Sequence, residues 1–282
     1  MAAAARNDLR ITRNAGGWVL LEIVREPVNS MDLALWQQLA AALDELEADP
    51  QVRGVIFASG LRRDVFTAGN DIKELFAPLT SQERYTEFWL TSNRFLARLY
   101  ASPLVTIAAI RGACPAGGCC LSMCCDYRIM TESGHIGLNE VALGISVPKM
   151  WAALMGRIIG TGPADKLLQN AVLLQPQDAK DLGLVDDIVP KDGLLAAAEE
   201  VMREMLKMPD GGRQATKLNL RADFAAEWAA FAEPEAEGAW QMLSSPAVVE
   251  ALGGVLQRLS GGRKPGGGGS GGGGVGSAQS RL

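Results

Sequence analysis

The chain has 282 residues, and its 27 Lys and Arg against 32 Asp and Glu give a formal net charge of -5. With 48% hydrophobic and 21% charged residues, the composition is that of a folded protein and excludes an intrinsically disordered chain. A mildly acidic chain lacks the broad basic face that binding to a nucleic-acid backbone requires, so no nucleic-acid partner is expected. No apolar run approaches the roughly 18 to 20 residues of a membrane span, so none is predicted.

All five cysteines lie between Cys114 and Cys125. An odd number in one short stretch is a poor disulfide framework and indicates a reducing compartment. Two interpretations remain open: thiolates that ligate zinc or an iron–sulfur cluster, and small apolar residues that fill a helix. The cysteines are more simply explained as small apolar residues of a helix, and no metal is expected, because separated C-x-x-C pairs are absent and the only histidine, His135, lies well downstream.

The first part of the chain alternates strands and helices. Apolar residues predict strands at residues 9–11 and 18–24, and a short buried strand at residues 54–58. Asp32 is expected to cap a helix that runs to about Ala48, because leucines recur there at helical spacing.

The remaining chain continues this pattern and then becomes helical. Thr80 to Glu83 form a capping-box pattern that predicts a helix to about Tyr100. The later predictions are strands at residues 104–110, 127–130 and 185–189, a short helix through the cysteines, helices around Met150, Pro163, Gln177 and Leu194, and helix throughout beyond Gly211. The alternation predicts an α/β core with a helical C-terminal extension.

The C-terminal residues have a different composition. From Gly261 the chain is rich in glycine, which is typical of a flexible tether, and it ends in Ser280-Arg281-Leu282. This tripeptide is a conservative variant of the Ser-Lys-Leu address of the peroxisomal import receptor. We therefore expect peroxisomal rather than mitochondrial localisation through that receptor.

The pattern along the whole chain predicts three parts. These are an α/β core at residues 1–206, a helical oligomerisation region at 207–260 and a tether at 261–282.

Three segments carry residues suited to chemistry. Residues 65–74 form a glycine-containing turn, which taken alone is an ordinary strand-to-helix loop. In residues 110–119 a strand leads into glycines that open a helix, and unpaired N–H groups at a helix start can hold an anion or an oxyanion. In residues 135–145, Glu140 lies among apolar side chains. Such a glutamate often faces solvent, but if it points inward, burial raises its pKa and makes it a proton acceptor near neutral pH.

Together these motifs resemble the enoyl-CoA hydratase/isomerase (crotonase) superfamily, and within it the Δ3,Δ2-enoyl-CoA isomerases of fatty-acid β-oxidation. The resemblance covers about residues 7–260. It is carried, in chain order, by Phe66-Thr-Ala-Gly-Asn-Asp-Ile-Lys-Glu-Leu75, Gly112-Ala-Cys-Pro-Ala-Gly-Gly-Cys119, Cys125-Asp-Tyr-Arg-Ile129 and Gly137-Leu-Asn-Glu-Val-Ala-Leu-Gly144. It implies a spiral of repeated ββα units with a helical C-terminal extension, assembled as a homotrimer or a dimer of trimers.

The resemblance also implies roles for individual residues. The backbone N–H groups of Asn70 and Gly117 would form an oxyanion hole for the thioester carbonyl, and Glu140 would be the base that moves a proton from C2 to C4. The residues that would line the coenzyme A arm are Ala68, Gly69, Asn70, Asp71, Ile72 and Lys73, with Lys73 on the phosphates. The acyl-CoA thioester is then the substrate, and no cofactor is expected.

Two positions distinguish the reactions within the superfamily. The resemblance implies that hydratases place a second glutamate where this chain has Cys120. The dienoyl-CoA isomerase branch places an Asp there and another at the position of Pro148. Because neither position holds a carboxylate here, a single-base isomerase is favoured. A 2-enoyl-CoA hydratase, an acyl-CoA thioesterase and a catalytically silent acyl-CoA-binding member stay open as alternatives.

Overall fold

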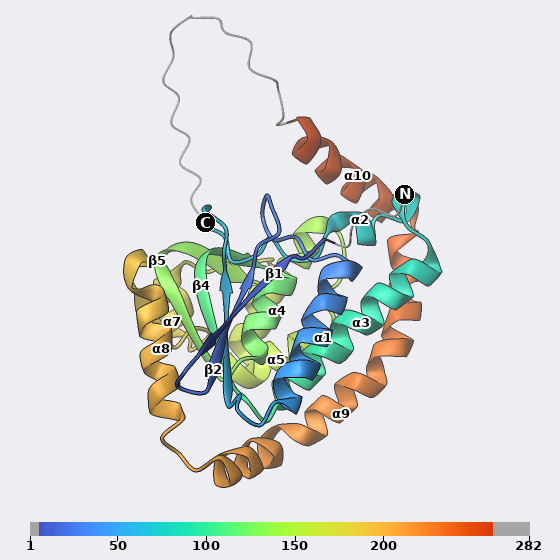
Figure 1. The fold of residues 1–282 in the computed structure, drawn as a ribbon. Coiled ribbons are helices and arrows are strands. Elements are labelled where there is room, and N and C mark those ends of the chain that lie inside the picture. The colour runs from blue at the N-terminus through green and yellow to red at the C-terminus, as the bar shows by residue number, and fades with distance from the viewer. Residues whose placement is uncertain (1–5, 262–282) are drawn as a thin grey trace, which may run out of the picture.

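A parallel sheet forms the centre of the computed structural model, which describes residues 6–261 (Figure 1). The described strands are β1 (Leu9–Asn14), β2 (Trp18–Ile23), β3 (Gly54–Ser59), β4 (Val105–Pro115), β5 (Tyr127–Gly137) and β6 (Asp187–Val189). They lie side by side in chain order, β1 antiparallel to β2 and every later pair parallel. The carboxyl ends of β3, β4 and β5 therefore meet at one edge of the sheet, where open α/β sheets bind ligands.

Helices connect and cover these strands. The described helices are α1 (Leu33–Ala48), α2 (Ile72–Leu75), α3 (Gln82–Ala101), α4 (Gly117–Cys124), α5 (Lys149–Ile159), α6 (Thr161–Gln169), α7 (Pro176–Asp181), α8 (Leu194–Met205), α9 (Asp210–Leu243) and α10 (Pro246–Gly261), with short 3-10 turns η1 (Ala77–Leu79), η2 (Glu140–Leu143) and η3 (Lys191–Gly193). The predicted α/β core with helices at its C-terminal end is confirmed. No helix within residues 6–261 is long and apolar enough to cross a membrane.

Two helix starts were predicted from capping residues, and one of them is confirmed. Asp32 caps α1 as predicted, because its Oδ1 accepts a hydrogen bond of 3.0 Å from the Leu35 N–H. The predicted capping box at Thr80 is wrong. Ser81 is the cap of α3 instead, accepting from the Arg84 N–H at 3.2 Å, because the helix begins one residue later than the pattern suggested.

At the centre of the sheet both faces are buried, which explains why a strand such as β3 is apolar without alternation, whereas β1 at the edge is largely exposed. Every residue of β3 is buried. Val55 and Phe57 pack into the larger core with α1, α3 and α4, whereas Ile56 and Ala58 pack on the opposite face against α8. Figure 1 shows α8 on one side of the sheet and α1, α3 and α9 on the other.

A register shift divides the pairing of β4 with β5 into two segments. The shift lies between Ile110 and Gly112, beyond which the end of β4 pairs with the end of β5. Val65 and Leu174 join these strand ends through single bridges to Ala113 and Ile136. Gly112 has a φ of +71°, and a Cβ at this position would lie 2.0 Å from the Asp64 carbonyl oxygen, so the crossing requires glycine. This winding agrees with the predicted crotonase-like spiral.

The C-terminal helices share the core of the α/β part. Phe224 and Trp228 of α9 are buried in the same cluster as side chains of α1 and α3. The division of the chain at residues 206 and 207 therefore stays a prediction.

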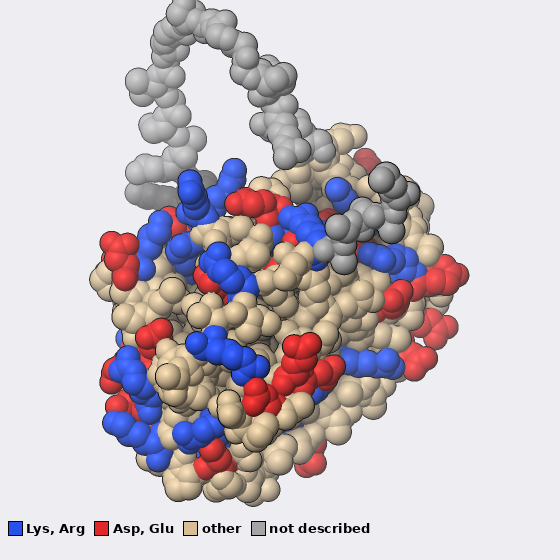
Figure 2. Space-filling view, viewed as in Figure 1, with Lys and Arg blue, Asp and Glu red and all other residues tan. Residues whose placement is uncertain are grey.

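Gly261 is the last residue of α10, and the predicted tether beyond it and the tripeptide at 280–282 lie outside the described residues. On the face in Figure 2, basic and acidic side chains are interspersed.

Candidate active site

The loop after β3 is held by backbone hydrogen bonds to the segment before α1. The Met31 N–H donates to the Gly69 carbonyl at 2.9 Å, and the Asp71 N–H donates to the Met31 carbonyl at 2.9 Å. In this bridge the N–H of Asn70 points away from Met31. Asp71 then caps α2 through its Oδ1, which accepts from the Lys73 N–H at 3.0 Å.

The start of α4 has a strained backbone. Ala116 has a φ of 50° and a ψ of -124°, a conformation that glycine adopts far more readily. Its N–H donates to the Gly137 carbonyl at 2.8 Å, which ties the end of β4 to the end of β5. This turn makes Gly117 the first residue of α4, so its N–H is one of the helix-start donors without an intrahelical acceptor.

These two segments contact one another closely. A Cβ on Gly69, whose φ is +85°, would lie 3.1 Å from the Ala116 Cβ and 3.4 Å from the Gly117 nitrogen. Within residues 6–261 neither the Asn70 nor the Gly117 N–H has a hydrogen-bond acceptor. The fold thus brings together the two predicted donors, and both are free to bind an oxygen atom.

Glu140 follows β5 and points into the protein. Only 5% of the residue is exposed, and both carboxylate oxygens are buried without a hydrogen-bond partner in the described part of the chain. Burial raises the pKa of Glu140 from 4.5 to about 7. The inward orientation that makes this residue a usable base is therefore present.

Two thiols of α4 lie within electrostatic range of Glu140. Burial, together with the nearby Cys114 thiol and the Glu140 carboxylate, raises the pKa of Cys119 well above the ordinary thiol value. Burial, contact with Cys124 and the Glu140 charge do the same for Cys120. All five cysteines are buried and unoxidised, and residues 6–261 contain no group of three or more potential metal ligands. Neutral thiols of α4 therefore lie near Glu140.

Comparison with known proteins identifies the family. Residues 17–246 match the family model described as enoyl-CoA hydratase/isomerase. The chain belongs to this family. It is 34% identical over 250 residues to the Mus musculus mitochondrial enoyl-CoA delta isomerase 1, covering 88% of this chain and 86% of the mouse protein. The predicted family is confirmed.

Solved structures agree with this family assignment. The crystal structure of human mitochondrial delta3-delta2-enoyl-CoA isomerase matches with a TM-score of 0.87 and 32% identity, covering 92% of this chain and 100% of the human chain. An enoyl-CoA hydratase from Bacillus halodurans matches with a TM-score of 0.81 and 23% identity, covering 88% and 100%, and shows the shared fold alone.

The prediction of peroxisomal localisation is contradicted by these relatives. The mouse, human and rat proteins are all named mitochondrial. The prediction depended on three terminal residues, 280–282, and so short a pattern occurs by chance far more readily than similarity over most of a chain. The predicted contact with the peroxisomal import receptor depended on the same three residues and is not proposed.

In this enoyl-CoA hydratase/isomerase family member, the residues predicted to contact coenzyme A lie in the loop before α2 and in α2 itself. Ala68 and Lys73 are exposed, and Ile72 is half-buried. The Lys73 ammonium group has no ion-pair or hydrogen-bond partner within residues 6–261. It is therefore free to bind an anionic group next to the site.

Sequence reasoning missed two residues that hold the site. Glu74 is 6% exposed and accepts hydrogen bonds from the Leu33 N–H at 3.0 Å and from Arg84 at 2.8 Å, which ties α2 to α1 and α3. Trp36 donates to the side chain of Asn70 at 3.1 Å. No role was predicted for Glu74 or Trp36, because neither contact follows from local spacing.

Helix α10 lies across the segments that carry the site. A Cβ on Gly144, just after η2, would contact the Ala251 Cβ at 3.5 Å. A Cβ on Gly253 would contact the ring of Phe76, just after α2, at 3.6 Å. Figure 1 shows α10 beside α2, so α10 contacts both the segment after η2 and the segment after α2.

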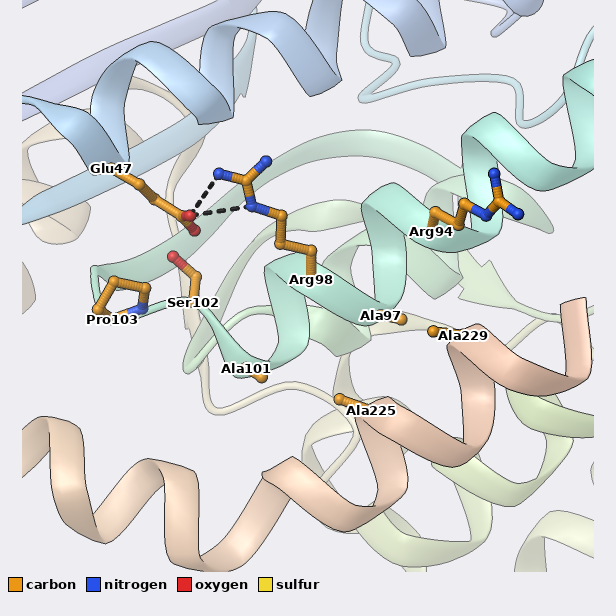
Figure 3. A pocket seen from close by; sticks show the side chains of 9 residues that line it. All are labelled: Glu47, Arg94, Ala97, Arg98, Ala101, Ser102, Pro103, Ala225 and Ala229. Atoms are coloured by element: carbon orange, nitrogen blue, oxygen red, sulfur yellow. Dashed lines mark hydrogen bonds and ion pairs between the residues drawn. The ribbon is translucent and has the colours of Figure 1, made fainter.

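A separate cavity of about 260 Å³ lies between α1, α3 and α9 (Figure 3). It is lined by Glu47, Arg94, Ala97, Arg98, Ala101, Ser102, Pro103, Ala225 and Ala229. Arg98 and Glu47 pair with one another at 2.6 Å, as the dashed lines show. None of the site residues lines this cavity, so it is not the candidate active site.

Proposed function

We propose that this protein is a Δ3,Δ2-enoyl-CoA isomerase of fatty-acid β-oxidation, which shifts the double bond of a 3-enoyl-CoA to give 2-trans-enoyl-CoA. The similarity to the mouse isomerase extends over 86% of that protein's length. The observation that carries the proposal is Glu140, a buried carboxylate without a partner, which follows the strand paired to the Gly117 segment.

The first step requires stabilisation of negative charge on the thioester oxygen. Removal of a C2 proton leaves a dienolate whose charge lies largely on that oxygen. The N–H groups of Asn70 and Gly117 have no competing acceptor among residues 6–261 and would donate to it. Loss of one such donor typically raises the barrier by about 2.7 to 4 kcal/mol. These two donors are the proposed oxyanion hole.

Glu140 supports a single-base proton transfer. A base must accept the C2 proton and then return it at C4, and this is efficient when its pKa lies near the working pH. Burial brings the pKa of Glu140 to about 7. One carboxylate can therefore act as the base in the first step and as the acid in the second.

The thiol at Cys120 favours isomerisation over hydration. Hydration of a 2-enoyl-CoA requires a second carboxylate to orient water, and the raised pKa of Cys120 keeps it a neutral thiol. Pro148, the other position that could hold an acid, is the residue before α5 and carries no titratable group. Slow or absent hydration is therefore expected.

The coenzyme A part of the substrate would lie along residues 68–72. Ala68 is exposed there, and the free ammonium of Lys73 would contact a phosphate. In this proposal acyl-CoA is the substrate, and the reaction needs no cofactor because a proton is moved within one molecule.

We also propose that the chain assembles as a homotrimer or a dimer of trimers. The first half of α9 carries Leu218 and Leu220 with 46% and 68% of their surface exposed, and such apolar residues favour a protein contact. Sedimentation equilibrium should give three or six times the chain mass of 29.9 kDa. A mass equal to one chain would contradict this assembly.

The compartment that the named relatives favour is the mitochondrion. The mouse, human and rat proteins carry that word in their names. Fractionation of the source cells should recover the protein with mitochondrial markers, and recovery with another organelle would contradict the proposal.

The proposed function is tested with purified protein and 3-hexenoyl-CoA, by following the absorbance of the conjugated 2-enoyl thioester. Wild type should form it rapidly, and Glu140→Gln should lower kcat about 10²- to 10⁴-fold. Glu132→Gln, an exposed glutamate on β5, is the matched control and should keep the wild-type rate. Rapid hydration of crotonyl-CoA or release of free thiol, without conjugation, would replace the isomerase with a hydratase or a thioesterase.

A further inference from the structure

The side chain of Asn70 is held by a buried tryptophan. The indole Nε1–H of Trp36 donates to the Asn70 Oδ1 at 3.1 Å. Trp36 lies on α1 with 0% of its surface exposed. Because an indole N–H can only donate, it selects the oxygen of the carboxamide and turns that oxygen toward α1.

The same oxygen lies against the start of α4. A Cβ on Gly117 would be 3.0 Å from the Asn70 Oδ1 and 3.3 Å from its Cγ. The carboxamide therefore fills the space between Trp36 and the Cα of Gly117. A change in its orientation would displace the two residues that supply the proposed oxyanion-hole donors.

Two separate contacts fix the Asn70 peptide. On one side Met31 accepts from the Asp71 N–H and donates to the Gly69 carbonyl, each at 2.9 Å. On the side-chain side the only hydrogen bond of Asn70 within residues 6–261 is the one from Trp36.

Trp36 is itself held rigidly. Its ring packs against Phe95 of α3 with centroids 5.6 Å apart. At the start of the same helix the Leu33 N–H donates to the buried carboxylate of Glu74. The indole is therefore a fixed reference point in the core rather than a mobile side chain.

We propose that Trp36 is a positioning residue for the oxyanion hole, acting through the Asn70 carboxamide to aim the Asn70 N–H beside that of Gly117. This inference rests on the proposed function. It extends that function by one residue which makes no contact with the substrate and lies outside all the site motifs.

The test compares two buried indole-to-asparagine hydrogen bonds. Trp36→Phe removes the indole N–H and keeps an aromatic ring. Trp228→Phe is the control, because Trp228 is also 0% exposed and donates at 3.0 Å to the Asn93 Oδ1, which accepts from Trp151 as well, and it has no hydrogen bond to any site residue. We expect Trp36→Phe to lower kcat for 3-hexenoyl-CoA about three- to tenfold with KM changed less than about twofold. Trp228→Phe should keep the wild-type kcat.

A double-mutant cycle separates this role from a general loss of structure. In an Asn70→Ala background, Trp36→Phe should have no further effect on kcat, because its contact has already been removed. Equal kcat values for Trp36→Phe and Trp228→Phe, or additive losses in the double variant, would overturn the inference. If Glu140→Gln kept full activity, the proposed function would fail instead, so the two failures are distinguishable.

Discussion

Strand β5 has a carboxylate with little exposed surface near each end, and the two have opposite environments. Asp126, just before the strand, accepts from Lys217 at 2.9 Å, from Arg221 at 2.8 Å and from the Thr106 N–H at 2.9 Å. Glu140, three residues after the strand, accepts from no group in the described part of the chain.

The difference separates a structural charge from a chemical one. A buried charge is tolerated when partners compensate its lost hydration, and the cluster around Asp126 does this. No neighbouring group among residues 6–261 compensates Glu140 in this way, and burial outweighs the opposing effect of its own backbone N–H, so its pKa rises. An acid left without partners at the ligand-binding edge of a sheet costs stability and gains a proton affinity suited to catalysis.

The largest expected effect is at the paired end of β5. Asp126→Asn should lower the free energy of unfolding by about 3 to 5 kcal/mol, because Lys217 would stay buried without a carboxylate. Urea unfolding measures this. The control Asp44→Asn removes an exposed partner of Arg98 and should cost little. A fall in kcat of the folded Asp126→Asn protein would contradict the distinction between a structural Asp126 and a catalytic Glu140.

At the unpaired end the sign is reversed and depends on pH. The folded-state pKa of Glu140 lies above its ordinary value of 4.5, so the wild type loses stability as pH rises through about 7. Glutamine does not titrate. Glu140→Gln should therefore raise the free energy of unfolding by up to about 3 kcal/mol at pH 8, with the gain vanishing near pH 4.5. A loss of stability at pH 8 would show that Glu140 is paired after all.

A smaller effect is expected where the two loops meet. Gly69→Ala places a Cβ at a φ of +85° and 3.1 Å from Ala116, so it should cost about 1 to 2 kcal/mol and lower kcat. Gly183→Ala is the control, since its φ is +77° and it has no atom within 4 Å. Thermal unfolding should show similar losses for both variants, whereas only Gly69→Ala should be slow. Equal kcat values would mean that the contact between Gly69 and Ala116 does not shape the site.

Much of the fold follows from local sequence. The leucine spacing after Asp32 and the apolar run at 54–58 predict α1 and β3 almost residue for residue. Motif order identifies the family because four segments must occur together. The Thr80 cap fails because the neighbouring Ser81 also carries a hydroxyl that can cap a helix, and the three-dimensional course of the chain selects Ser81 although only Thr80 has a glutamate three residues later.

The site was less accessible to sequence reasoning. Glu140 has apolar neighbours in either orientation, so only packing reveals that it points inward. Asn70 and Trp36 are far apart in the chain, and their hydrogen bond depends on how α1 packs against the loop after β3. Roles that depend on which backbone N–H is left unpaired cannot be predicted from residue types.

The pH dependence of kcat/KM for 3-hexenoyl-CoA, between pH 5 and 9, tests the central claim most directly. Glu140 must be ionised to accept the C2 proton, and burial places its pKa at about 7. The rate should therefore rise with pH through one ionisation with a midpoint near 7 and reach a plateau above it. A rate that is already constant from pH 5 upward, or a midpoint near 4.5, would contradict the assignment of a buried, unpaired Glu140 as the base.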